Sequence, residues 1–328
     1  MKFDFELEKL AKQVNEKEAK KVLIQLPEGM KMHAFEIVDY INKNTKAEAI
    51  ISGESNWGGC DIALDEAKNL KVDLLIHFGH AQFIKADFPI IYVEVKDNTD
   101  LTELLKKSLE KIQGKIMGLV SSVQHMHKIE EVKKYYEENG KKVIIPGKKG
   151  FAYYDGHVVG CEYNSLKLIE KEVEIYIVLG NQFHSLGAAL SVNKQVILID
   201  TYNMEIVDMK KLKEKVLKQR AVAIDKIKIA RNIGIIIGTK PGQAFGRYET
   251  IKKKLEAIGK NVVILTMNEV NQEKLTNFYG LQGFIELACP RIAIEDYGKY
   301  DKPIITFRES LVVLGEMKYE DLIEKGFL

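Results

Sequence analysis

The same strand–loop–helix pattern opens three times along this chain of 328 residues. Runs rich in Val, Ile and Leu begin near residues 21, 115 and 232, and a loop and a charged helical segment follow each of them. Regular alternation of strand and helix is typical of parallel sheets, because a parallel strand needs a crossover connection. The pattern predicts an α/β fold of three similar Rossmann-like domains, at about 1–112, 113–224 and 225–328.

Each predicted domain is a small parallel sheet with helices on both faces. In the first we expect strands at 21–26, 47–53, 72–79 and 89–95, and helices at 34–42, 61–69 and 101–112. In the second we expect strands at 115–122, 141–147, 173–180 and 196–200, and helices at 129–139 and 164–171. In the third we expect a strand and loop at 232–243, strands at 261–267, 283–289 and 302–307, and helices at 248–259 and 270–277.

Charge and apolar patterning exclude several classes of protein. Lys and Arg number 49 against 47 Asp and Glu, so the chain lacks the basic excess of a dedicated nucleic-acid binder. No run of eighteen or more apolar residues occurs, and the N-terminal segment lacks an apolar signal core, so neither a membrane span nor a leader is expected. Three dispersed cysteines are too few for a disulfide scaffold, which indicates a reducing, cytoplasmic location.

The three cysteines fall where parallel α/β sheets usually carry their sites, beyond the carboxyl ends of strands. Cys60 follows the second strand of the first domain, and Cys161 lies between the second and third strands of the second. Cys289 is expected to end the third strand of the third domain, directly before Pro290. A lone cysteine is more often a small buried apolar residue than a ligand. One cysteine per domain at a similar edge nevertheless predicts a shared site.

Residue spacing alone leaves the nature of that site open. Three thiolates suit a soft metal. They could hold zinc with a histidine or water as fourth ligand, or a 4Fe–4S cluster with one iron free of protein ligands. No CxxC or CxxxCxxC motif is present, so neither a zinc ribbon nor a standard radical S-adenosylmethionine loop is available.

Six segments spread along the chain are distinctive: VLIQLPEGM, GESNWGGCD, HFGHAQF, GNQFHSLGA, GTKPGQ and ACPRIAIEDY. They resemble the corresponding segments of the archaeal enzymes of the first step of diphthamide biosynthesis. The Gly–Gly–Cys and Ala–Cys–Pro–Arg segments are the most specific, and the resemblance extends over essentially the whole chain. One departure is Trp57, where a tyrosine is expected more often; either ring can pack beside a cluster.

The resemblance implies a specific enzyme. It implies a 4Fe–4S cluster on Cys60, Cys161 and Cys289 and a transfer of the 3-amino-3-carboxypropyl group of S-adenosylmethionine to a histidine of translation elongation factor 2. It further implies a radical made by breaking the Cγ,Met–S bond, three domains around the cluster, a homodimer, and a separate electron donor that remains to be identified.

Further residues are candidates for binding S-adenosylmethionine. The loop Pro27–Glu28–Gly29 and the loop containing Gly242 and Gln243 follow first strands and should line the central cleft, although both are also simple turns. Gln182 and His184 open a helix whose backbone amides could receive a carboxylate.

Arg291 and two pairs of histidines complete the set of candidates. Arg291 could bind the substrate carboxylate, or form an ion pair with Glu286 or Glu295. His77 and His80 are expected on opposite faces of a strand end and to form loop hydrogen bonds rather than to bind a metal. A substrate-pocket role or a structural role is open for His125 and His127.

Two other functions remain compatible with the residues. A dehydratase similar to quinolinate synthase would also place one cysteine in each of three α/β domains around a cluster. A non-enzymatic binding module would keep its cysteines as buried core residues.

Overall fold

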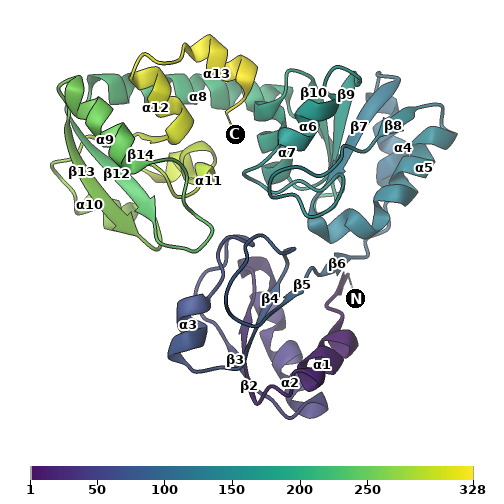
Figure 1. The fold of residues 1–328 in the computed structure, drawn as a ribbon. Coiled ribbons are helices and arrows are strands. Elements are labelled where there is room, and N and C mark those ends of the chain that lie inside the picture. Colours follow the sequence, from purple (N-terminus) through teal and green to yellow (C-terminus); the bar gives the residue numbers. More distant parts are fainter. Residues whose placement is uncertain (1, 328) are drawn as a thin grey trace.

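Three sheets, each flanked by helices, lie at the corners of a triangle in the computed structural model, which describes residues 2–327 (Figure 1). In addition, β1 (Phe3–Asp4) and β6 (Lys96–Asp97) form a short antiparallel ladder. Among the described residues no helix is long and apolar enough to cross a membrane.

The first sheet contains four parallel strands in the order β3-β2-β4-β5. Its strands are β2 (Lys21–Gln25), β3 (Glu48–Ile51), β4 (Leu74–Phe78) and β5 (Ile90–Val93). The helices of this part of the chain are α1 (Leu7–Glu16), the 3₁₀ helix η1 (Glu28–His33), α2 (Ala34–Asn44) and α3 (Leu64–Asn69). Every residue of β4 is buried, as expected for a central parallel strand covered on both faces.

The second sheet has the order β11-β10-β9-β7-β8 and is parallel except for its edge strand β11. Its strands are β7 (Ile116–Ser121), β8 (Lys142–Ile144), β9 (Ile175–Gly180), β10 (Gln195–Asp200) and β11 (Glu205–Asp208). The helices are α4 (Thr102–Lys111), η2 (Val123–Lys128), α5 (Ile129–Glu138), α6 (Asn164–Ile169) and α7 (Gln182–Ser191).

The third sheet is parallel, with the order β13-β12-β14-β15. Its strands are β12 (Asn232–Gly238), β13 (Asn261–Met267), β14 (Gly283–Glu286) and β15 (Ile304–Thr306). The helices are α8 (Lys210–Ile229), α9 (Tyr248–Ala257), α10 (Gln272–Thr276), α11 (Pro290–Ile294), η3 (Asp296–Lys299), α12 (Phe307–Val313) and α13 (Tyr319–Lys325).

The three sheets share one strand order. In each, the first strand lies between the second and the third, and the fourth strand follows the third. All twelve strands that the sequence predicts are present, mostly within two residues of the expected bounds. The chain is therefore an α/β protein with several parallel sheets, as expected.

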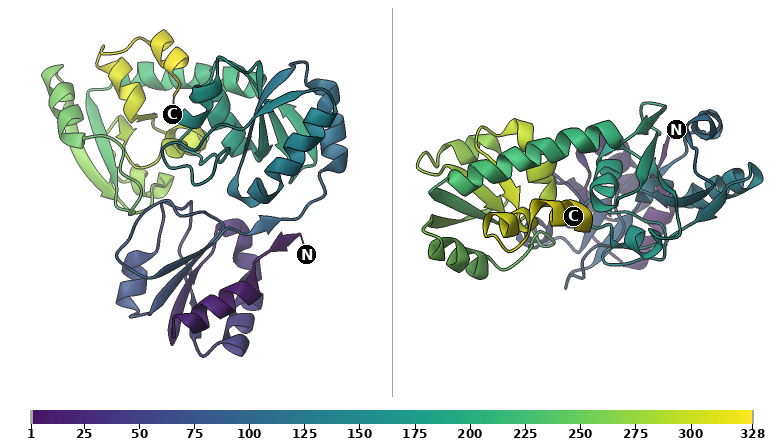
Figure 2. Two further views of the ribbon diagram at one scale, coloured as in Figure 1. Left: turned by 45° about the vertical axis from the view of Figure 1, so that its right-hand side comes forward. Right: turned by 90° about the horizontal axis from the view of Figure 1, so that it is seen from above.

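The helices at the expected domain boundaries differ from the prediction. Helix α4 was expected in the first domain, but Leu101, Leu104 and Leu105 pack in one apolar cluster with the second sheet. The expected boundary at residue 224 falls inside α8, a helix of 20 residues that packs on α12 and β15 and also contacts α7 (Figure 2). One apolar cluster consequently runs from the second sheet to the third through α8.

Candidate functional site

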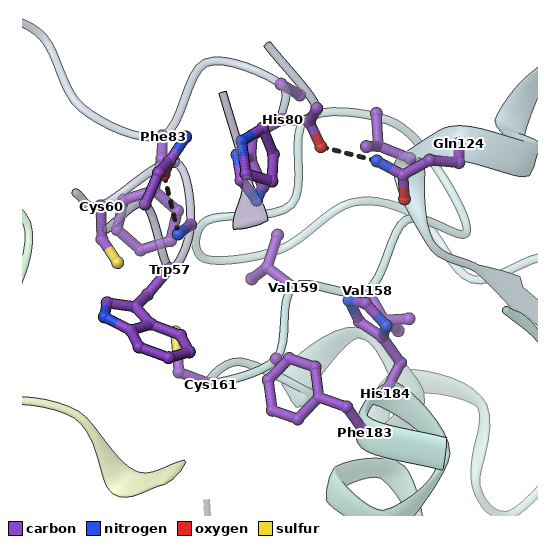
Figure 3. Close-up of a pocket in the computed structure, with 18 of the residues that line it drawn as sticks. Trp57, Cys60, His80, Phe83, Gln124, Val158, Val159, Cys161, Phe183 and His184 are labelled. Carbon is purple, nitrogen blue, oxygen red and sulfur yellow. Dashed lines mark hydrogen bonds between the residues drawn. The ribbon is translucent and has the colours of Figure 1, made fainter. Parts of the chain in front are cut away.

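Loops from all three sheets enclose one cavity of about 410 Å³, and all three cysteines line it. Cys60, Phe83, Trp57 and Cys161 lie together at one side of this central cavity, and Phe183 and His184 line it further along (Figure 3). The structure thus brings three cysteines that are distant in sequence to one cavity. Cys289 also borders a second cavity of about 390 Å³, which shares Trp57 and Arg291 with the first.

Cys60 lies in the loop between β3 and α3, which packs closely against its neighbours. A Cβ atom on Gly59 would lie 2.9 Å from Phe83 Cβ and 3.0 Å from the Ala81 carbonyl oxygen, so only glycine fits. The loop following β12 contacts Cys60 from the other side, where the Gly242 N–H donates to the Cys60 carbonyl oxygen at 2.8 Å. Residues of the first and third sheets together therefore fix Cys60.

Cys161 lies near the end of a long loop between β8 and α6, and this loop reaches back to the first sheet. Phe151 of this loop stacks on Phe83 with ring centroids 4.3 Å apart, and the Tyr154 hydroxyl donates to Glu94 Oε1 at 2.6 Å. A Cβ atom on Gly160 would overlap the Phe183 ring at 1.6 Å, so glycine is again required before the cysteine.

Cys289 is the N-cap residue of α11, and Pro290 occupies the first turn of that helix. The strand β14 ends at Glu286, so Cys289 lies three residues beyond the strand rather than at its end as expected. The buried Glu286 carboxylate accepts the Cys289 N–H at 2.8 Å and the Ala288 N–H at 3.0 Å, which fixes the turn. Glu286 therefore helps to position Cys289 at the site. The sequence suggests Glu286 only as an ion-pair partner for Arg291.

Burial raises the pKa of all three thiols, to about 12 for Cys161, and the neighbouring cysteines raise it further for Cys161 and Cys289. Three thiolates can coexist here only beside added positive charge, such as that of iron ions. Within residues 2–327 no group of three or more His, Cys, Asp or Glu side chains is arranged to hold a single metal ion. Three thiols that line one cavity are a donor set that fits an iron–sulfur cluster.

Neutral imidazoles form another part of the cavity wall. Burial lowers the pKa of His80 and His157 to about 4 and that of His184 to about 3. All three rings line the cavity. They are therefore uncharged at neutral pH and can form hydrogen bonds, but they hold an added proton only weakly.

A hydrogen-bonded chain joins His80 to Gln25. Gln25 Oε1 lies 2.9 Å from His77 Nδ1, and His77 Nε2 lies 3.0 Å from His80 Nδ1. An amide oxygen only accepts, so His77 carries its proton on Nδ1, its Nε2 accepts from His80, and His80 Nε2 is left unprotonated. The hydrogen-bonding role expected for these histidines is present. Their expected placement on opposite faces is wrong, because Gly79 has φ +81° and turns the chain between them.

Of the predicted substrate-binding residues, Pro27, Glu28, Gly29, His184 and Arg291 line the central cavity. Gln182 does open α7, as expected, but its side chain is exposed and does not line the cavity. Gly242 packs on the Cys60 backbone, and Gln243 borders the second cavity. Neither His125 nor His127 lines either cavity, although both lie in η2. Gln124, the residue before His125, lines the central cavity instead.

Arg291 makes one contact that was expected from the sequence and one that was not. Its guanidinium lies over the Phe183 ring at 3.5 Å from the centroid, and Nη2 is 3.1 Å from Glu295 Oε2. The expected ion pair with Glu295 is present, and the side chain also lines both cavities.

A partly buried polar network joins the first and third sheets beside Cys60, and it was not predicted from the sequence. Lys240 Nζ lies 2.5 Å from Asp61 Oδ2 and 3.0 Å from Glu269 Oε2. Trp57 Nε1 donates to Glu269 Oε1 at 2.9 Å. The aromatic residues Phe83, Phe151 and Phe183 were missed as well. In the sequence, this network could have been suspected only because Lys240 and Asp61 lie next to glycine-rich segments.

Comparison with known proteins agrees with the geometry. A family model described as putative diphthamide synthesis protein matches residues 26–323. The chain is 32% identical over 314 residues to the 2-(3-amino-3-carboxypropyl)histidine synthase of Pyrococcus horikoshii, covering 93% of this chain and 90% of that protein. It is 28% identical over 331 residues to subunit 1 of the human 2-(3-amino-3-carboxypropyl)histidine synthase, covering 97% of this chain and 73% of the human protein.

Solved structures are similar over nearly the whole chain. The crystal structure of Dph2 from Pyrococcus horikoshii superposes with a TM-score of 0.87 at 30% identity, covering 96% of this chain and 92% of that one. A second structure of the same protein, with a 4Fe–4S cluster, gives the same values. These relatives favour the diphthamide interpretation over one related to quinolinate synthase. The chain belongs to the diphthamide synthesis protein family.

Proposed function

We propose that this protein transfers the 3-amino-3-carboxypropyl group of S-adenosylmethionine to a histidine of translation elongation factor 2, as a 2-(3-amino-3-carboxypropyl)histidine synthase. The observation that carries the proposal is the convergence of Cys60, Cys161 and Cys289 on one cavity, in a chain whose relative binds a 4Fe–4S cluster. The names of the curated relatives support the activity.

In this proposal the three cysteine thiolates hold a 4Fe–4S cluster and leave one iron without a protein ligand. When bound, the cluster supplies the electron that breaks the Cγ,Met–S bond. The chain's own residues decide which bond faces the cluster, because they fix how S-adenosylmethionine enters. The cavity wall contains apolar side chains such as Phe83, Phe183 and Val159, which would exclude water from a reactive carbon fragment.

Charged and neutral polar groups have distinct proposed roles. Arg291 is the cation of the cavity wall, and we assign to it the carboxylate of the methionine part. The N-terminal turn of α7, next to His184, can add backbone N–H donors to the same carboxylate. The neutral rings of His80, His157 and His184 can form hydrogen bonds with the bound substrate without adding positive charge to the cavity.

We also propose the larger arrangement that the resemblance implies. The three sheets are three Rossmann-like domains around the cluster, with bounds close to 1–112, 113–224 and 225–328. The equal strand orders support three related domains, although α4 and α8 pack across those bounds. We propose a cytoplasmic homodimer that receives electrons from a separate donor.

The test is an anaerobic incubation of the reconstituted protein with dithionite and S-adenosylmethionine. We expect methylthioadenosine as the nucleoside product, with the carbon fragment appearing as aminobutyrate or homocysteine sulfinate. Adding elongation factor 2 should divert the fragment to its histidine, which mass spectrometry detects. If 5′-deoxyadenosine were the main nucleoside, the proposed bond cleavage would be wrong.

A further inference from the structure

Cys60 differs from the other two cysteines in how its sulfur is held. Gln243 Nε2 donates to Cys60 Sγ at 3.7 Å, and the Gln243 side chain is 6% exposed. Among residues 2–327 this is the single side-chain hydrogen bond to a cysteine sulfur. The donor comes from the loop after β12 of the third sheet, and the sulfur from the loop after β3 of the first.

The position of Gln243 relative to Cys60 is fixed by contacts on both sides of it in the chain. The adjacent Gly242 approaches the Cys60 backbone so closely that a Cβ atom would lie 2.6 Å from Cys60 Cα. Lys240, three residues before Gln243, pairs with Asp61, the residue after Cys60, and with Glu269. The contacts of Gly242 and Lys240 therefore hold the loop of residues 239–243 in place, and this loop positions the Gln243 amide beside the Cys60 sulfur.

We propose that Gln243 is a positioning residue for the iron–sulfur group, acting through its N–H···S hydrogen bond to Cys60. A donor to a ligand sulfur draws electron density from the thiolate and so favours the reduced state of the group. The bond also orients the Cys60 side chain for binding. The inference rests on the proposed function, since it requires that Cys60 bind the cluster, and it replaces the sequence-based role of Gln243 in substrate binding.

The experiment compares iron content and midpoint potential in matched variants. Gln243→Leu keeps the approximate size of the side chain and removes the donor, while Gln243→Glu replaces the donor with an acceptor. The control is Gln82→Leu, the same substitution at a glutamine of the cavity rim that bonds to the Ile84 carbonyl and to no cysteine. Thermal unfolding of each metal-free protein reports whether the variant still folds.

We expect a lower midpoint potential in both Gln243 variants than in the wild type and in Gln82→Leu, with the larger shift in Gln243→Glu. Loss of iron from the Gln243 variants alone, with an unchanged unfolding temperature of the metal-free protein, would equally support the positioning role. Iron content and potential equal to those of Gln82→Leu would overturn the inference. A wild-type protein that binds no cluster would instead refute the proposed function, so the two failures are distinguishable.

Discussion

His125 is a buried imidazole outside the cavity, and it makes the stability of the protein sensitive to acid. Its Nε2 lies 3.1 Å from Thr201 Oγ1, and its pKa is lowered to about 4 by burial, which outweighs the opposing charge of Asp97. Because the folded pKa lies below the unfolded value of 6.5, the unfolded chain binds more protons between these values. The free energy of unfolding that depends on a neutral His125 ring is therefore fully present above pH 6.5, and it is lost as the pH falls toward 4.

We therefore expect the free energy of unfolding to drop by about 3 kcal/mol from this one group between pH 6.5 and 4. Denaturant titrations at several pH values measure it. The variant His125→Asn should lose that part of the pH dependence. His127→Asn, at a neighbouring exposed side chain, should change the slope less. Equal slopes in both variants would contradict the assignment.

For single residues, the sequence indicated which residue types belong to the site better than it indicated which distant residues touch one another. The three cysteines and the ion pair of Arg291 with Glu295 were predictable, because cysteine placement and helical spacing are visible in the chain. The pairing of Trp57 with Glu269 was not, since 212 residues separate them and only the packing of two sheets brings them together.

Helices α8 and α12 are joined by a buried ion pair. Arg220 of α8 donates to both carboxylate oxygens of Glu309 at 2.7 Å and to the carbonyl oxygens of Ala293 and Ile304. Both charged side chains are at most 1% exposed. Removing one member would leave an unpaired charge in the interior.

We expect Arg220→Met to lower the free energy of unfolding by about 3 to 5 kcal/mol, measured by chemical denaturation. Replacing Glu309 with Gln in the same chain should recover part of the loss. The control Lys228→Met breaks an exposed ion pair with Asp225 and should cost less than about 1 kcal/mol. A loss in Arg220→Met no larger than in the control would show that the pair does not stabilise this helix contact.

At the level of elements, strands were predicted better than helix packing. Strands such as β9, with all six residues buried, give long apolar runs that periodicity detects. Helix α8 is amphipathic only weakly, because it contacts neighbours from two sheets, and no single stripe of apolar residues identifies its partners. The short antiparallel strand β11, of four residues, carries Glu and Asp at its ends and gives little strand signal.

In the whole molecule, the central cavity lies where loops of the three sheets meet (Figure 1). The contacts between the first sheet and the others are largely polar or aromatic, such as the Lys240–Asp61 pair and the Phe83–Phe151 stack. The second and third sheets instead share an apolar cluster through α8. A group bound by one cysteine from each sheet would therefore add a direct link between the first sheet and the other two.

The most direct test of the central claim is a count of iron and acid-labile sulfide per chain after anaerobic reconstitution, together with the visible spectrum. We expect roughly four of each in the wild type, as for a 4Fe–4S cluster. We expect a large loss in each of Cys60→Ala, Cys161→Ala and Cys289→Ala, because all three thiols line one cavity. Full iron and sulfide content in any one of these variants would contradict a cluster shared by the three cysteines.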